Sequence, residues 1–218
     1  SLLLSYPAQE SPPFSKSEDE RSKTVIHYRP AEMLKTHQWF LSYFSFTGTV
    51  SIVLMFGAQM KMLAREFNLP ESYFYWVLVL FPLANGLSRV FAGAVSDKIG
   101  REKTMMLFYY ILSLSIFAFV MLAHIPALFV LIVFTASLLG GAPFALYPAT
   151  IGDYYGAKYA TTNYGITYTA KAWAGLMSGW LSGYLLIKFG SYRLALVSLA
   201  IASLLAAALS NRRLLKMP

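Results

Sequence analysis

The chain has 218 residues, of which 57% are hydrophobic and only 13% charged. Its mean hydropathy is +0.53 and its formal net charge is +8. Soluble domains usually carry about 25% charged residues, so the composition excludes an ordinary soluble domain and indicates a membrane protein. The sequence contains no Cys, which excludes disulfides and thiolate metal sites. Because the positive charges lie between apolar segments, membrane topology explains them better than nucleic-acid binding.

The leading segment, residues 1–37, is polar and rich in Ser, Pro and charge, with no cleavable-signal pattern. We expect it to form a largely disordered cytoplasmic linker. The chain begins with Ser1 rather than Met, and "SLLLSYP" resembles the last turn of an earlier apolar helix. We therefore expect a fragment or a processed product.

Six apolar segments follow the linker, separated by turn sequences such as "NLPES" and "SDKIGREK". A bilayer core about 30 Å thick needs about 20 apolar residues in a spanning helix, and the last segment is the shortest. The segments predict an all-α membrane protein, with six transmembrane helices bundled over residues 38–211 and a cytoplasmic tail over 212–218. The expected spans are Trp39–Leu63, Phe74–Val95, Met105–Ala123, Ala127–Ile151, Thr162–Ile187 and Leu194–Ser210.

Loop charge predicts the orientation, because loops rich in Lys and Arg stay in the cytoplasm. One set of loops and ends carries Lys16, Arg21, Lys23, Arg29, Lys35, Lys98, Arg101, Lys103, Lys158, Arg212, Arg213 and Lys216. The other set carries only Lys61, Arg65, Lys188 and Arg193. We therefore expect both termini in the cytoplasm of a multi-pass protein of the plasma membrane.

Two basic residues, Arg89 and Lys171, fall inside the expected spans, while all ten acidic residues lie outside the spans or at their edges. A charge at the bilayer centre costs about 2.5–3.5 kcal/mol on insertion scales, so such groups normally face a cavity and have a partner. Lys171 lies about nine residues into its span, or about 13 Å at the helical rise. Two buried cations without internal carboxylates predict a site for a small external anion.

Neighbouring polar side chains complete the predicted site. Tyr164, Thr167 and Tyr168 lie one or two turns before Lys171, and Asn85 lies one turn before Arg89. Two alternatives stay open. The ammonium group of the lysine could instead bind carbonyls or an acid on a partner chain, and the arginine could snorkel to the membrane surface.

The fourth and fifth segments have unusual backbones. "LLGGAPFALYPATIG" places two glycines and two prolines within nine residues, which predicts a bent or unwound helix and puts Tyr147 into the cavity. "GLMSGWLSG", from Gly175 to Gly183, has glycines four residues apart, which predicts close helix packing.

No catalytic or metal-binding constellation appears. His27, His37 and His124 lie in loops without ligand spacing, and there is no Walker loop, zinc motif or nucleophile elbow. We therefore expect no enzyme activity, no cofactor, no metal and no nucleic-acid partner.

The loop "GAVSDKIGREK" resembles the signature of the major facilitator superfamily, which follows the second helix of each six-helix half. The matching residues are Gly93, Asp97, Lys98, Gly100, Arg101 and Lys103. This resemblance implies the carboxy-terminal half of the fold, helices seven to twelve of a twelve-helix transporter. A missing amino-terminal half, or a second chain, would be its partner.

"NYGITYTAKAWAG", together with Arg89, resembles the oxalate/formate antiporter family, whose carboxylate-binding Arg and Lys correspond to Arg89 and Lys171. The resemblance implies exchange of small carboxylates such as oxalate and formate by alternating access. Related proton-coupled monocarboxylate transporters have an Asp where this chain has Asn85, which disfavours proton symport. Proton symport and a non-transporting anion-binding subunit remain the alternatives.

Overall fold

The computed structural model describes residues 27–211 and residue 215, and every regular element in this part of the chain is helical. The prediction of an all-α fold is therefore confirmed for these residues. The elements are α2 (Pro30–Met33), α3 (His37–Glu66), α4 (Glu71–Ile99), α5 (Arg101–Leu122), α6 (Pro126–Gly140), α7 (Pro143–Tyr155), η1 (Ala157–Tyr159), α8 (Ala160–Tyr168), α9 (Ala170–Leu176), η2 (Met177–Leu181), α10 (Ser182–Phe189) and α11 (Arg193–Leu209).

Four helical segments of the described chain are long and apolar enough to cross a membrane. They are α3, α4, α5 and the combined segment Pro126–Tyr155. The fifth expected span is divided into α8, α9, η2 and α10, and the sixth is the 17-residue helix α11. The structure thus accounts for four of the six expected spans by length and composition.

The fourth expected span is interrupted, as its glycines and prolines predict. Helix α6 ends at Gly140, and α7 begins at Pro143, which has no N–H to continue the hydrogen-bond ladder. The fifth expected span is interrupted twice. Thr169 separates α8 from α9, and η2 is a π-helical turn. Such interruptions in membrane helices are tolerated only where protein or a water-filled cavity satisfies the backbone.

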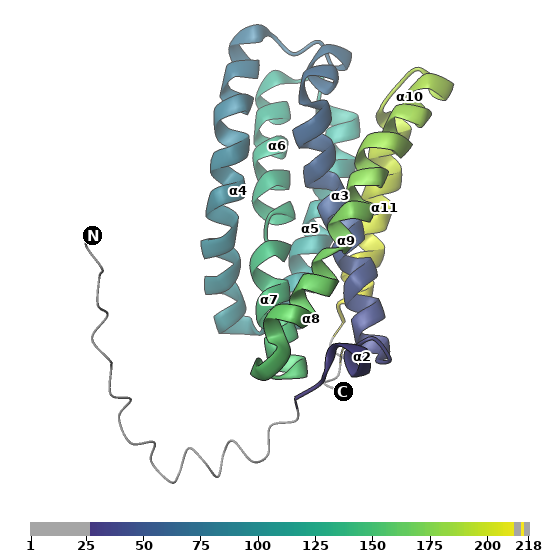
Figure 1. Ribbon diagram of the computed structural model, residues 1–218. Coiled ribbons are helices and arrows are strands. Elements are labelled where there is room, and N and C mark those ends of the chain that lie inside the picture. Colours follow the sequence, from purple (N-terminus) through teal and green to yellow (C-terminus); the bar gives the residue numbers. More distant parts are fainter. Residues whose placement is uncertain (1–26, 212–214, 216–218) are drawn as a thin grey trace, which may run out of the picture.

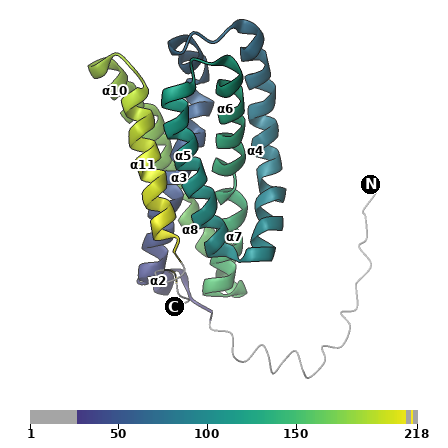
Figure 2. The same cartoon turned by 180° about the vertical axis from the view of Figure 1, so that it is seen from behind.

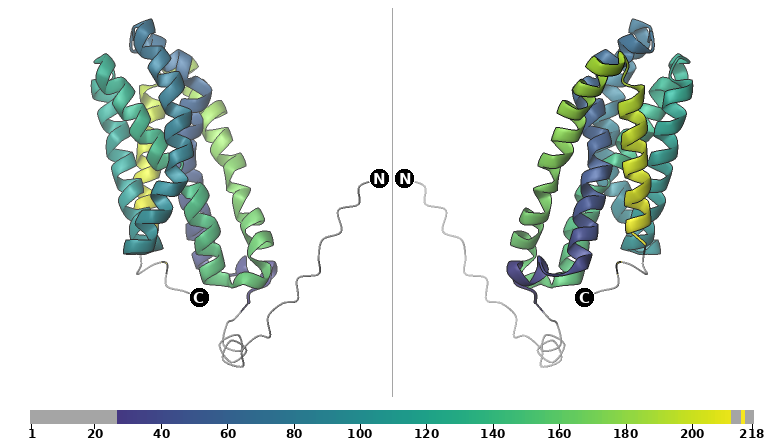
Figure 3. Two further views of the ribbon diagram at one scale, coloured as in Figure 1. Left: turned by 90° about the vertical axis from the view of Figure 1, so that its left-hand side faces the viewer. Right: turned by 90° about the vertical axis from the view of Figure 1, so that its right-hand side faces the viewer.

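The helices run side by side with their ends gathered at two poles (Figures 1 and 2). One pole holds the α3–α4, α5–α6 and α10–α11 turns, and the other holds α2, the α4–α5 turn and the α7–α8 turn. Helix α4 lies at one side of the bundle and α11 at the other. Figure 3 shows the α8–α10 segment, in light green, on the outside of the bundle next to α3.

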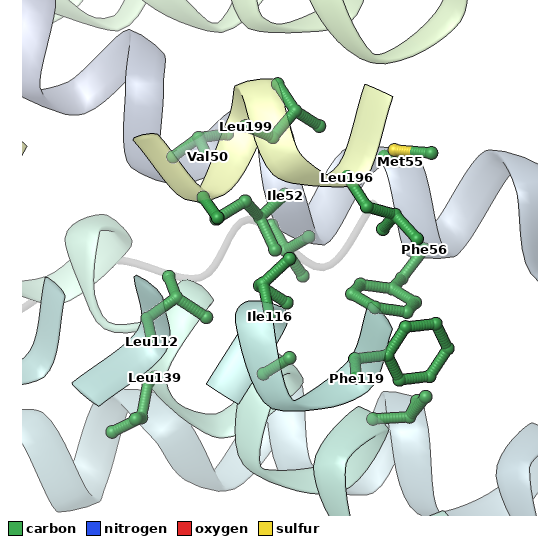
Figure 4. Packing of buried hydrophobic residues seen from close by; sticks show 14 of the residues in the cluster. Val50, Ile52, Met55, Phe56, Leu112, Ile116, Phe119, Leu139, Leu196 and Leu199 are labelled. Carbon is green, nitrogen blue, oxygen red and sulfur yellow. The ribbon is translucent and has the colours of Figure 1, made fainter. Parts of the chain in front are cut away.

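The core lies where α3, α5, α6 and α11 meet (Figure 4). Phe119 is central to it: its ring makes an edge contact with Phe56 at 5.1 Å and lies 4.9 Å from the ring of Phe129. Buried hydroxyls add bonds between helices, because Ser113 donates to the carbonyl of Ala200 on α11 at 2.8 Å. The core is therefore enclosed mainly by these four helices, and α4 and α8–α10 lie at its edges.

Close helix packing occurs at Gly48 rather than at the glycines of the fifth span. A Cβ at Gly48 would lie 2.9 Å from the carbonyl oxygen of Ala202, so this glycine lets α3 approach α11. A Cβ at Gly175, Gly179 or Gly183 meets no atom of the described chain within 4 Å. The close approach predicted for these three is therefore not made to another helix of the described chain.

The described end of the expected linker, residues 27–37, is structured. The amide of Tyr28 donates to the carbonyl of Tyr155 at 3.0 Å, the hydroxyls of Thr36 and Tyr155 lie 2.8 Å apart, and Met33 is buried. These contacts fasten α2 to α7. The rest of the expected linker, and most of the expected tail, lie outside the described residues.

Candidate functional site

A cavity of about 410 Å³ opens between α3, α4, α7 and the α8–α9 segment. It brings together Arg89 and Lys171, which are 82 positions apart in the sequence. Both Asn85 and Tyr168 also reach it. The complete lining is Val53, Leu54, Gly57, Ala58, Phe81, Asn85, Arg89, Phe144, Tyr168 and Lys171.

Among the described residues, the ammonium group of Lys171 contacts neutral partners only. Its Nζ donates to the hydroxyl of Tyr168 at 3.2 Å and lies 5.4 Å from the centre of that ring. It also lies 5.6 Å from the ring centre of Phe144. Cation–π contacts stabilise a cation by about 0.5–2 kcal/mol, far less than hydration does. The lysine is therefore tolerated in this cavity but remains available to an anion.

Arg89 is held in the same way from the other side of the cavity. Its Nη1 donates to the backbone carbonyl of Asn85 at 3.0 Å, and its guanidinium carbon lies 5.6 Å from the ring centre of Phe144. One phenyl ring thus lies beside both cations. Phe144 was not among the predicted site residues, although it directly follows the proline that begins α7.

Neither cation forms an ion pair within the described chain. The salt bridges found there both involve Arg101, the first residue of α5. Arg89 is exposed and Lys171 half-buried, so the cavity opens at the surface of the bundle. The guanidinium group supplies a planar set of donors and the ammonium group a point charge, a combination that suits a small carboxylate.

The other predicted site residues lie around this cavity in different ways. Tyr164 packs against Tyr168, with the ring centres 5.6 Å apart. Tyr147 is buried and stacks on Phe46 at 4.6 Å. Thr167 is also buried, and its hydroxyl accepts a hydrogen bond from the indole N–H of Trp39 at 3.1 Å. The structure therefore brings Asn85, Arg89, Tyr168 and Lys171 to one cavity and gives Tyr147 and Thr167 contacts with α3.

Both interrupted helices contribute directly to the cavity. Phe144 is the second residue of α7, just after the break at Gly141, and Lys171 is the second residue of α9, just after the break at Thr169. Gly141 also lies against α4, where a Cβ would meet Asn85 and Ser88. Discontinuous helices at a substrate site are a recurring design of secondary transporters.

The geometry of the α4–α5 turn depends on Gly100 and Arg101. Gly100 has a φ of +92°, a conformation that side chains disfavour. Arg101 contacts three acceptors: its Nη1 lies 3.1 Å from Asp97 and 2.8 Å from the Ser96 hydroxyl, and its Nε lies 3.2 Å from Asp153 of α7. This one side chain therefore joins α4, α5 and α7.

Replacing Arg101 by Ala is expected to lower the thermal unfolding midpoint measured in detergent, because two ion pairs and a hydrogen bond are lost together. Exposed ion pairs contribute less than about 1 kcal/mol each, so a loss of about 1–2 kcal/mol is expected. Asp97→Asn removes one of these contacts and should shift the midpoint less. Equal shifts in the two variants would contradict the central role of Arg101.

The sequence profile of the Major Facilitator Superfamily matches residues 39–215. The chain belongs to this superfamily. The match covers every described element from α3 onward and confirms the family predicted from the loop signature. Family membership and the apolar helices together indicate a multi-pass membrane protein that belongs to a family of transporters rather than of enzymes.

Two curated relatives add detail. The oxalate:formate antiporter of Oxalobacter formigenes is 31% identical over 185 residues, which are 84% of this chain and 44% of that protein. An uncharacterized 38 kDa protein in the 23S RNA operon of Thermoproteus tenax is 35% identical over 130 residues, which are 60% of this chain and 33% of that protein. The chain thus spans less than half the length of the curated relatives it matches. The likeness to the oxalate:formate antiporter agrees with the predicted family.

Proposed function

We propose that this chain forms one half of a secondary transporter that exchanges small carboxylates, such as oxalate and formate, by alternating access. The observation that carries the proposal is the meeting of Arg89 and Lys171 at one cavity without a carboxylate partner in the described chain. These cations now donate only to neutral acceptors in the described chain, and an incoming carboxylate would add the attraction of an opposite charge and accept two parallel bonds from the guanidinium group.

The proposed half is the carboxy-terminal one, with six transmembrane helices over residues 38–211 and both termini in the cytoplasm of a plasma-membrane protein. Two facts support it. The matched region covers 44% of the oxalate:formate antiporter, and Arg89 is exposed in the present bundle. Lipid cannot solvate a guanidinium group, so a second six-helix unit, in the same protein or another chain, would cover the cavity.

Exchange, rather than one-way transport, follows from the charge of the empty site. Without an anion, the two cations have only neutral partners in the part of the chain that the structure describes. Reorienting that empty site across the membrane should be unfavourable, since its charges lack compensation. A bound carboxylate removes much of this cost, so each half-cycle would need a substrate.

Counterflow in proteoliposomes tests the proposal, using the full-length transporter that contains this chain. Vesicles loaded with unlabelled oxalate should take up labelled oxalate or formate, and empty vesicles should not. Uptake into empty vesicles driven by a pH gradient would select the proton-symport alternative. Binding of label without any exchange would select the non-transporting subunit.

Replacing Asn85 by Asp would test whether this position faces the substrate. A carboxylate at this position, one turn before Arg89, is expected to pair with the guanidinium group and compete with the substrate. Exchange should fall several-fold at neutral pH and recover as the pH is lowered, because protonation removes the competing charge. Unchanged exchange at all pH values would show that Asn85 does not face the substrate.

A further inference from the structure

A second cavity, of about 660 Å³, lies on the same α3–α4 groove toward the pole that holds the α3–α4 turn. It is lined by Lys61, Ala64, Arg65, Asn68, Leu69, Glu71, Phe74 and Tyr75. We call this second cavity the outer cavity and the one that holds Arg89 and Lys171 the inner cavity. They share one face of α3, because Gly57 and Ala58 line the inner cavity while Lys61 and Arg65 line the outer one. These positions recur at helical spacing, so the two cavities follow one another along the same face of the helix.

The two cavities also follow one another along α4. Phe74 lines the outer cavity and Phe81 the inner one, seven residues further on. Seven residues of helix rise by about 10 Å, so the two cavities are about two helical turns apart. A small carboxylate moving along the groove would therefore pass from the outer pair of cations to Arg89 and Lys171.

The outer cavity has an excess of positive charge. Lys61 and Arg65 are exposed and lie one turn apart, and neither forms an ion pair within the described chain. Glu71 lines the same cavity, but its carboxylate accepts a hydrogen bond from the hydroxyl of Tyr75 at 3.1 Å. Glu66, which directly follows Arg65, instead accepts bonds from the α10–α11 turn, including the amide of Tyr192 at 3.0 Å.

We propose that this outer cavity is a second anion site, at which Lys61 and Arg65 hold a small carboxylate before it enters the inner site. The inference rests on the proposed transport function. Clefts lined by one sign of charge raise the local concentration of an opposite ion and its association rate by about 10–1,000-fold, and salt weakens the effect. An exposed pair is well screened, so the outer site binds loosely and releases the anion inward.

The variant Lys61→Gln/Arg65→Gln tests this role in the full-length transporter. At low ionic strength, its initial exchange rate at oxalate concentrations well below KM should fall about tenfold, while the rate at saturating oxalate stays unchanged. The difference should shrink at high salt. The matched control is Lys188→Gln/Arg193→Gln, which also removes one Lys and one Arg charge from this pole of the bundle. It should keep the rate of the unaltered protein.

Two results would overturn the inference while leaving the proposed function intact. One is an unchanged low-oxalate rate in Lys61→Gln/Arg65→Gln. The other is an equal loss in the control pair, which would indicate a general surface charge. An unaltered transporter that exchanges no carboxylate would instead contradict the proposed function, and with it this inference.

Chemical modification separates charge from shape. The 218 residues contain no Cys, so Lys61→Cys introduces a unique thiol into this part of the protein. A thiol reagent that attaches a trimethylammonium group should restore most of the lost low-oxalate rate, and one that attaches a sulfonate should lower it further. Equal effects of the two reagents would mean that bulk rather than charge matters, and the anion site would be refuted.

Discussion

Replacing Arg89 or Lys171 by Gln is expected to abolish carboxylate exchange while the protein still inserts and folds. Each change removes one charged partner of the bound anion and leaves the other cation to bind it alone. Removing one member of a buried, hydrogen-bonded charge pair costs about 2–5 kcal/mol, so exchange efficiency should fall on the order of 100-fold or more. Counterflow of labelled oxalate measures this loss.

The two substitutions should not be additive, because both cations would contact the same small anion. The double variant Arg89→Gln/Lys171→Gln should be little worse than either single one. Arg89→Lys should recover only part of the activity, since an ammonium group cannot form the planar pair of bonds that a guanidinium group makes.

Lys188→Gln is the matched control for Lys171→Gln. Lys188 also lies over two aromatic rings, at 5.9 Å from that of Tyr184 and 5.5 Å from that of Phe189, but it is on α10 and far along the chain from the cavity lining. Exchange should persist in the Lys188→Gln variant. The thermal unfolding midpoint, measured for every variant at Arg89, Lys171 and Lys188, should report any loss of folding. Full exchange by the double Gln variant would refute the proposed binding pair.

The helical segments were predictable from the sequence because hydropathy and turn residues act locally. The expected span Trp39–Leu63 lies inside α3, and the expected break near Pro143 is where α6 ends and α7 begins. The continuity of the fifth span was less predictable. Its glycines gave a packing signal, but the sequence does not reveal that α8, α9, η2 and α10 divide this segment.

The site was predictable in its charges but not in its surroundings. An unpaired Arg89 and Lys171 stand out in any apolar segment, because burying a charge is costly wherever the chain folds. Phe144 carries no such signal: an aromatic residue in a membrane helix is ordinary until the fold places it beside both cations. Thr167 was a predicted site residue, but its hydroxyl is bonded to Trp39. The sequence did not reveal this contact, because the two residues lie 128 positions apart.

Gly141 lies in the break between α6 and α7 and also packs against α4 next to the anion site. Gly141→Ala is therefore expected to disturb both the helix packing and the site. The new Cβ would lie 2.9 Å from the side-chain nitrogen Nδ2 of Asn85 and 2.9 Å from the Cβ of Ser88. Real Cβ atoms do not approach their neighbours this closely. Ser88 is fully buried and its Cβ moves only with the backbone, so α4 itself must shift. Overpacking of this kind typically costs about 1–3 kcal/mol.

The shift of α4 should also move Arg89, which follows Ser88 directly and faces Phe144 just beyond Gly141. Gly141→Ala should therefore lower both the thermal midpoint in detergent and the affinity for oxalate. Gly86→Ala is the matched control, because it makes the same change on α4, and a Cβ there meets no described atom within 4 Å. If the two variants lose stability and oxalate affinity equally, the tight contact at Gly141 does not position Arg89, and the coupling between the broken helix and the anion site must be abandoned.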